Sequence, residues 1–355
     1  MATTTYVDWT FAKSAGRKLV PAGPEVSSEE AHDIVEAVRA AAAGAVQPVA
    51  ETARMHAPGE APAPLVVDRP SWIDANADSM AQLLDPVIAK VAAAVREGKE
   101  DRPEPSPLIQ AVGGKVTGAE VGAMLAFMAG KVLGQYDLAP GGTPKLMLVA
   151  PNLVQVQRQL DVDAADFRSW VCMHEETHRV QFTAVPWLRD HMIQRTQALA
   201  TDMVPDGQAL KDKLDQLGKR LPDVFKGDGQ GLAELVINPQ QREQMARVTA
   251  IMSLLEGHAD VIMDEVGPAH IPSVEEIRTK FNAKRKGGGA ADRLLRRLLG
   301  LEAKMRQYRD GAVFVRAVVD KVGMDGFNEI WTSPETLPMP SEITHPDQWV
   351  RRVHG

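Results

Sequence analysis

The chain has 355 residues, of which 44% are hydrophobic and only 5% are aromatic. Alanine, leucine, valine and methionine must therefore fill its core, which favours helices over a β-sandwich. The formal net charge of −7 argues against nucleic-acid binding over the whole surface. A single cysteine, Cys172, excludes an intrachain disulfide and favours a reducing compartment. Because no signal peptide and no long apolar run are visible, the sequence predicts a cytoplasmic protein that does not span a membrane.

Most of the predicted elements are helices, in keeping with this composition. Ser27 or Ser28 is expected to cap the first helix, and Pro86 to kink or break the second. Pro239 and Gly267 suit the first turn and the end of the last long apolar helix. The expected helices cover residues 27–56, 71–99, 117–137, 163–184 and 239–267, and the expected short strands cover 65–70 and 145–151.

These elements predict a mainly α fold with a few short strands. We expect a single unit over residues 1–355, in which an N-terminal helical subdomain (1–137) precedes a catalytic helical region (138–355). No internal repeat is visible in the sequence.

The segment MHEETHRVQF at residues 173–182 contains the pattern HExxH. His174 and His178 are four residues apart, so on a helix both imidazoles project from one face and can reach one metal ion. Glu175 projects beside them, where it can take a proton from a water that zinc activates. The pattern predicts one Zn²⁺ per chain, with Glu175 as the general base.

A structural alternative exists for the two histidines. Together with Phe167, Val171 and Gln181 they follow one stripe with spacings of three and four residues, which is typical of the buried face of a helix. On that interpretation His174 and His178 are core histidines whose nitrogens are satisfied by hydrogen bonds.

A third zinc ligand is predicted in the segment LLEGHADVIMD at residues 254–264. Catalytic zinc usually takes three protein ligands and keeps one position open. Glu256 shares a helix face with Met252, Ala259 and Met263, where a carboxylate is costly unless it binds a cation or finds hydrogen-bond donors. Asp260, one turn later, is expected to accept a hydrogen bond from a ligand histidine. The structural alternative is that Glu256 caps a helix or pairs with an arginine.

HExxH followed by Glu256-x-x-x-Asp260 resembles the gluzincin arrangement of zinc metallopeptidases. More narrowly, the chain resembles an actinobacterial family of zinc-dependent metallopeptidases that is often labelled as associated with biosynthesis of the deazaflavin coenzyme. Segments that carry this resemblance along nearly the whole chain include VVDRPSWIDAN, MHEETHRVQF, LLEGHADVIMD and FNEIWTSPETLP. The resemblance implies a zincin-like fold in which an edge strand borders the cleft above the HExxH helix, and KLMLVAP (145–151) is the candidate for that strand.

A peptidase also needs a donor for the oxyanion of its tetrahedral intermediate. The candidates are Tyr308, Arg306 and His258, of which Tyr308 is favoured, although an ordinary half-buried tyrosine is an equally good interpretation. His258 lies two residues from Glu256 and should point to another side of the helix. Cys172 lies two residues before His174, so its side chain should point away from the metal and into the core. His191 is expected to be structural.

Residues 278–309 contain eleven Lys/Arg and two Asp/Glu, so this stretch is strongly basic. A solvated helix face that pairs with the acidic remainder is the simpler interpretation, and sparse aromatics argue against binding single-stranded nucleic acid. The sequence thus predicts a zinc-dependent hydrolase, most simply a metallopeptidase acting on a peptide or protein. The alternatives are a non-catalytic zincin-like binding or assembly protein and, less in keeping with the sequence, a nucleic-acid-binding protein.

Overall fold

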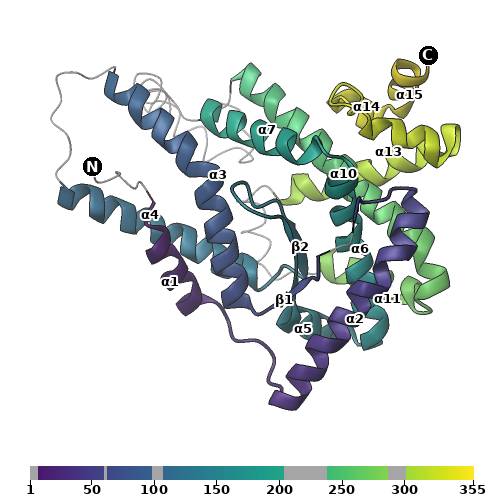
Figure 1. The fold of residues 1–355 in the computed structure, drawn as a ribbon, viewed down its shortest axis with the longest axis horizontal. Coiled ribbons are helices and arrows are strands. Elements are labelled where there is room, and N and C mark those ends of the chain that lie inside the picture. Colours follow the sequence, from purple (N-terminus) through teal and green to yellow (C-terminus); the bar gives the residue numbers. More distant parts are fainter. Residues whose placement is uncertain (1–6, 60–61, 98–106, 204–237, 287–300) are drawn as a thin grey trace, which may run out of the picture.

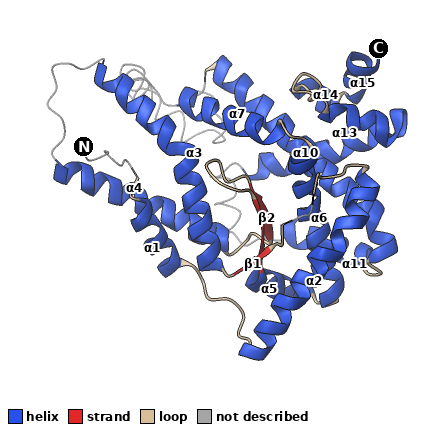
Figure 2. Ribbon diagram, viewed as in Figure 1, coloured by secondary structure: helices blue, strands red, loops and turns tan. Residues whose placement is uncertain are grey.

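The computed structural model describes residues 7–59, 62–97, 107–203, 238–286 and 301–355, and side chains are placed for most of these. The described chain is mainly helical with three short strands, as the sequence predicts (Figure 2). The N-terminal elements are α1 (Trp9–Leu19), α2 (Ser28–Ala53), β1 (Leu65–Val67), α3 (Arg69–Glu97), α4 (Pro107–Ala129), β2 (Gly134–Asp137) and β3 (Lys145–Val149). They are followed by α5 (Ala150–Leu160), α6 (Ala164–Ala184), α7 (Leu188–Met203), α10 (Pro239–His270), α11 (Val274–Lys286), α13 (Leu301–Asn328), the 3₁₀ turn Glu329–Trp331, α14 (Pro340–Thr344) and α15 (Pro346–His354).

The three strands form one small sheet in the order β1-β3-β2, with β1 parallel and β2 antiparallel to β3. Because successive side chains of a strand alternate between the two faces, β2 contacts a different helix on each side. On one face Gly134 packs against α6 and Tyr136 stacks on Phe182 of that helix. On the other face Gln135 donates a hydrogen bond to one side chain of α3, and Asp137 accepts a hydrogen bond from another side chain of that helix. The edge strand β2 is therefore held between α6 and α3.

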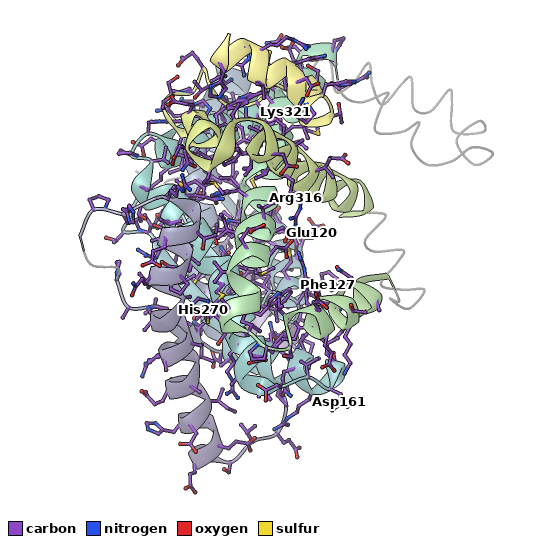
Figure 3. All side chains as sticks on the ribbon, turned by 90° about the vertical axis from the view of Figure 1, so that its right-hand side faces the viewer. Glu120, Phe127, Asp161, His270, Arg316 and Lys321 are labelled. Atoms are coloured by element: carbon purple, nitrogen blue, oxygen red, sulfur yellow. The ribbon has the colours of Figure 1, made fainter. Side chains whose placement is uncertain are left out.

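The main core lies where α2, α6, α10 and α13 meet (Figure 1). Phe167, Leu254, Ile262 and Phe314 are fully buried there. Figure 3 shows this side of the molecule, where Arg316 and Lys321 mark the course of α13 and His270 marks the end of α10. A second, smaller apolar cluster joins the helices α3 and α4 to the sheet. The HExxH helix thus runs through the centre of the main core.

Backbone contact brings α10 and α13 unusually close to each other. A Cβ added to Gly257 on α10 would collide with the carbonyl carbon of Gly311 on α13, and one added to Gly311 would collide with the backbone oxygen of Ser253. Only glycine at both positions permits this approach. The crossing point lies directly beside Glu256.

The structure corrects the predicted edge strand. KLMLVAP does not form an edge strand, since β3 ends at Val149 and is the central strand, with α5 beginning at the next residue. Pro151 falls in the first turn of α5, where its missing N–H costs nothing. The edge strand that lies beside α6 is β2, at the opposite edge from β1. It lies inside the segment 117–137 that was predicted to be helical, whereas α4 ends at Ala129.

Other boundaries also differ from those expected. Pro86 neither breaks nor ends α3, which runs through it from Arg69 to Glu97. The helices α1, α5 and α7 were not predicted, whereas Ser27 caps α2 and Pro239 opens α10 as expected. The division at residues 137 and 138 stays a prediction. None of the helices in the described part of the chain is long and apolar enough to cross a membrane.

Candidate metal centre

The helix α6 presents the HExxH residues because its start and its buried face are both strongly specified. Asp163 caps it by accepting hydrogen bonds from the N–H groups of Ala165 and Asp166. Downstream, Phe167, Val171 and Cys172 bury the helix in the core, and the Cys172 thiol faces inward as predicted. The two histidines, one turn apart, consequently emerge at a fixed place between α6 and α10.

His174, His178 and Glu256 form the one group among the described residues that has the donor set and spacing for a metal ion. Their ligand atoms all lie within 4.8 Å of one another. The Nε2 atoms of the two histidines are 3.2 Å apart, and Glu256 oxygens lie 3.6 Å from His174 Nε2 and 3.8 Å from His178 Nε2. Two imidazoles and one carboxylate are a donor set typical of catalytic zinc.

Glu256 reaches this point from α10, which crosses α6 inside the main core. Asn238 and Gln241 start α10 with a reciprocal capping box, and the glycine contact with α13 fixes its middle. The side chains of the group are only partly buried, with 23% of His174 and 26% of Glu256 exposed. The arrangement therefore has both a rigid frame and access from solvent.

The charges around these side chains favour a positive charge between them. Burial alone would lower the pKa of His174, but the nearby carboxylate of Glu256, together with Glu175 and Asp260, raises it to about 9. The pKa of His178 is lowered, first by burial and then by the charge on His174, against the opposing effect of Glu256. Without a metal, a proton held on His174 supplies the positive charge.

Glu175 lies beside the group in a nearly dry position, with only 7% of the residue exposed. Burial raises the pKa of its carboxyl to about 7, against the opposing charge of His174. Its side chain packs against the edge strand, so closely that a Cβ on Gly134 would lie 2.5 Å from Glu175 Cγ. A carboxylate with a pKa near 7 is suited to gain and lose a proton at neutral pH.

The structure also places Gln181 at the centre, a residue that the sequence indicated only as part of the buried stripe. Gln181 is fully buried, and its Oε1 lies 3.0 Å from His178 Nδ1. Its Nε2 lies 2.9 Å from the carbonyl oxygen of Leu255 and 3.0 Å from Nδ1 of His258. His258, which is buried among Phe327 and Trp331, is outside the metal group, and burial lowers its pKa to about 3.

The charge of Asp260 raises the pKa of both histidines. It does not orient His178, whose Nδ1 is bonded to Gln181 instead. Its hydrogen bond to His174 stays a prediction. The residues Tyr308 and Arg306 are on α13, but their side chains lie outside the described part of the structure.

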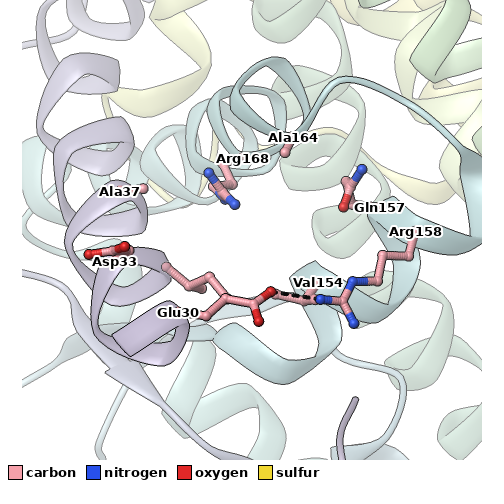
Figure 4. A pocket seen from close by; sticks show the side chains of 9 residues that line it. Glu30, Asp33, Ala37, Val154, Gln157, Arg158, Ala164 and Arg168 are labelled. Carbon is pink, nitrogen blue, oxygen red and sulfur yellow. Dashed lines mark hydrogen bonds and ion pairs between the residues drawn. The ribbon is translucent and has the colours of Figure 1, made fainter. Parts of the chain in front are cut away.

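Two further surface features differ in character from the group of His174, His178 and Glu256. A polar hollow lies elsewhere, between α2, the second half of α5 and the start of α6, and the ion pair of Glu30 and Arg158 crosses it (Figure 4). In the basic stretch 278–309, Arg278 pairs with Asp264 on α10, while most of the remaining stretch lies outside the described side chains. Among the residues that the structure describes, neither feature contains a metal-binding set of donors.

Comparisons with known proteins indicate the family of the chain. No curated protein matches the chain. A solved structure from Chloroflexus aurantiacus, described as a "putative hydrolase with a novel fold", matches with a TM-score of 0.67 and 28% identity, over 98% of this chain and 99% of the other. A family model for zincin-like metallopeptidases matches residues 7–350, nearly the whole sequence. The chain therefore belongs to the zincin-like metallopeptidase family.

Proposed function

We propose that this protein is a zinc-dependent peptidase in which His174, His178 and Glu256 hold the metal and Glu175 is the general base. The observation that carries the proposal is the convergence of two Nε2 atoms and a carboxylate within 4.8 Å, beside a nearly buried glutamate. Membership of the zincin-like family and the hydrolase description of the Chloroflexus protein support hydrolysis as the reaction class.

The residues present fit zinc in number, chemistry and accessibility. Three protein ligands leave a fourth position open, as in catalytic rather than structural zinc sites. The partial exposure of His174 and Glu256 favours a centre that a substrate can reach. A non-catalytic zincin-like protein would be expected to cover these side chains.

Bound zinc would act as a Lewis acid and lower the pKa of water towards about 7. In this proposal Glu175 would take the proton from the attacking water and then deliver it to the leaving amine. Its carboxyl pKa of about 7 suits both directions of transfer. The contact with Gly134 limits how far the carboxylate can turn away.

The edge strand β2 offers a way to position a peptide. Leu133 accepts a hydrogen bond from the N–H of Val149, so the next residues alternate in their pairing with β3. By this register Gly134 and Tyr136 direct their backbone N–H and C=O groups away from β3. An extended peptide added at this edge would pass directly beside Glu175, and peptides commonly bind proteins by such strand addition.

Other parts of the functional interpretation stay predictions. Tyr308 stays the predicted oxyanion donor, and the cytoplasmic location and the association with deazaflavin coenzyme biosynthesis are expectations from the sequence. The rival function is a zincin-like protein that retains zinc but binds or assembles without hydrolysis.

The proposal is tested by comparing the wild-type protein with Glu175→Gln on a mixed peptide library, at equal measured zinc content. The glutamine keeps the size of the side chain but cannot accept the proton, so cleavage should fall by about 10²–10⁴-fold while zinc is retained. Glu265→Gln, an exposed change on α10, is the matched control and should cleave like the wild type. Cleavage that survives in Glu175→Gln would reject the assigned base, and a wild-type protein with zinc but no cleavage would favour the rival function.

A further inference from the structure

The hydrogen bonds of Gln181 determine which way its side-chain amide faces. The backbone oxygen of Leu255, 2.9 Å away, can only accept a hydrogen bond. The amide group that faces it must therefore be the NH₂ group. The opposite end of the amide, which faces His178 Nδ1 at 3.0 Å, must be the carbonyl oxygen.

This orientation fixes the position of the proton on His178. A carbonyl oxygen accepts, so His178 Nδ1 must carry a hydrogen and donate it to Gln181. The lone pair of the neutral ring is then on Nε2, the atom that faces His174 and Glu256. The ring is presented to a metal in the binding tautomer before any metal arrives.

The second hydrogen of the Gln181 amide extends this series of hydrogen bonds towards the interior of the protein. It points to His258 Nδ1 at 3.0 Å, which accepts it, so the hydrogen of His258 is on Nε2. His258 is fully buried, and its ring stacks on Phe327 with 5.3 Å between centroids. Packing therefore holds His258, the last acceptor in this series of hydrogen bonds, in place.

We propose that Gln181 and His258 are positioning residues that set the tautomer and the place of the metal ligand His178. Gln181 does so in two ways, since its bond to Leu255 also ties α6 to α10 one residue before Glu256. The ligands from the two helices are thereby held at a fixed separation. The inference rests on the proposed metal centre, and it assigns to an amide and a buried histidine the supporting role that carboxylates often play at metal sites.

Two pairs of variants separate hydrogen bonding from the loss of volume. Gln181→Met keeps the length of the side chain but removes every hydrogen bond, whereas Gln181→Glu can still accept from His178 and cannot donate to Leu255. His258→Asn can place an acceptor where Nδ1 lies, whereas His258→Leu has nearly the same size and cannot accept. Thr177→Val is the control, because Thr177 is equally buried on α6 but its hydroxyl donates only to the carbonyl of Met173.

The measurements are the zinc dissociation constant, from competition with a chelator, and the visible spectrum of the Co²⁺-substituted protein, which reports coordination geometry. Gln181→Met should weaken zinc binding by about 10–100-fold and change the Co²⁺ spectrum. His258→Leu should weaken binding more than His258→Asn does, and Thr177→Val should stay within about twofold of the wild type. If Gln181→Met does not fold, the comparison of His258→Asn with His258→Leu decides alone.

Neither measurement requires hydrolysis, so the two proposals can fail separately. Zinc binding by Gln181→Met and His258→Leu that equals the binding by Thr177→Val, with unchanged Co²⁺ spectra, would overturn this inference and leave the metal centre standing. A wild-type protein that binds no zinc would overturn the metal centre and this inference together.

Discussion

Gly134 on the edge strand lies against Glu175 of the HExxH helix with no room for a side chain between them. A Cβ on Gly134 would lie 2.5 Å from Glu175 Cγ and 2.9 Å from its Oε1. Such distances are far shorter than a van der Waals contact, so either the strand or the carboxylate must move if the glycine is replaced. The glycine thus sets the position of the proposed base relative to the edge at which a peptide would bind.

Gly134→Ala should therefore reduce hydrolysis while the zinc content stays normal. A displacement of about 1 Å in catalytic geometry can cost about 10²-fold in rate. The check is the cleavage rate of a peptide substrate at equal zinc content. Gly142→Ala is the control, since the added Cβ would come no closer than 3.9 Å to any neighbour. Equal rates for the two variants would show that the contact with Gly134 does not position Glu175.

The three proposed ligands should be separable from nearby carboxylates by metal analysis. His178→Ala and Glu256→Gln each remove one of three ligand atoms that lie within 4.8 Å, so each should lose nearly all zinc when the protein is purified without added metal. Glu265→Gln, on the same helix but exposed, should keep about one zinc per chain. Full zinc occupancy in Glu256→Gln would rule out this glutamate as the third ligand.

Much of the site was predictable because it depends on local geometry. The spacing of His174 and His178 places both imidazoles on one helix face in any folded context. Glu256 was predictable for a different reason, since a carboxylate on an apolar helix face needs a partner. In both cases the signal lies within a few turns of one helix.

The features that could not be predicted depend on contacts between distant segments. The edge strand β2 has the sequence GQYD, which carries little apolar signal, and it forms because β3 pairs with it. Gln181 is an ordinary member of a buried stripe until α10 brings Leu255 and His258 to its amide. Similarly, the predicted strand 145–151 runs two residues past the end of β3 at Val149, because Ala150 and Pro151 already belong to the first turn of α5.

The glycines in helices should respond to substitution with opposite signs. Gly311→Ala would place its Cβ on the backbone oxygen of Ser253, so α13 must move away from α10, at an expected cost of about 1–3 kcal/mol in the free energy of unfolding. Gly44→Ala, inside α2, meets nothing within 4 Å and should stabilise the protein by about 0.5–1 kcal/mol. Urea unfolding of the metal-free proteins measures both. A neutral Gly311→Ala would mean that the helices do not meet at this point.

Zinc binding should depend on pH through the proton on His174. The pKa of His174 in the metal-free protein is raised to about 9, because Glu256 outweighs the effect of burial. Zinc needs the lone pair of this ring, so the proton must leave when the metal binds. The apparent affinity should therefore rise about tenfold per pH unit up to about pH 9 and then level off. Calorimetry at pH 6, where a zinc-bound water with a pKa of about 7 would keep its proton, in buffers with different ionisation enthalpies should report release of about one proton per zinc.

The same proton should make the stability of the metal-free protein depend on pH. The pKa of His174 in the folded state lies above its usual value of 6.5, so this contribution is complete below pH 6.5 and is lost as the pH rises through about 9. The urea midpoint of the metal-free protein should consequently fall between pH 6.5 and 9.5. The zinc-bound protein has no proton at this ring and should lack that component of the fall. Identical pH profiles for the two forms would show that His174 holds no proton in place of the metal.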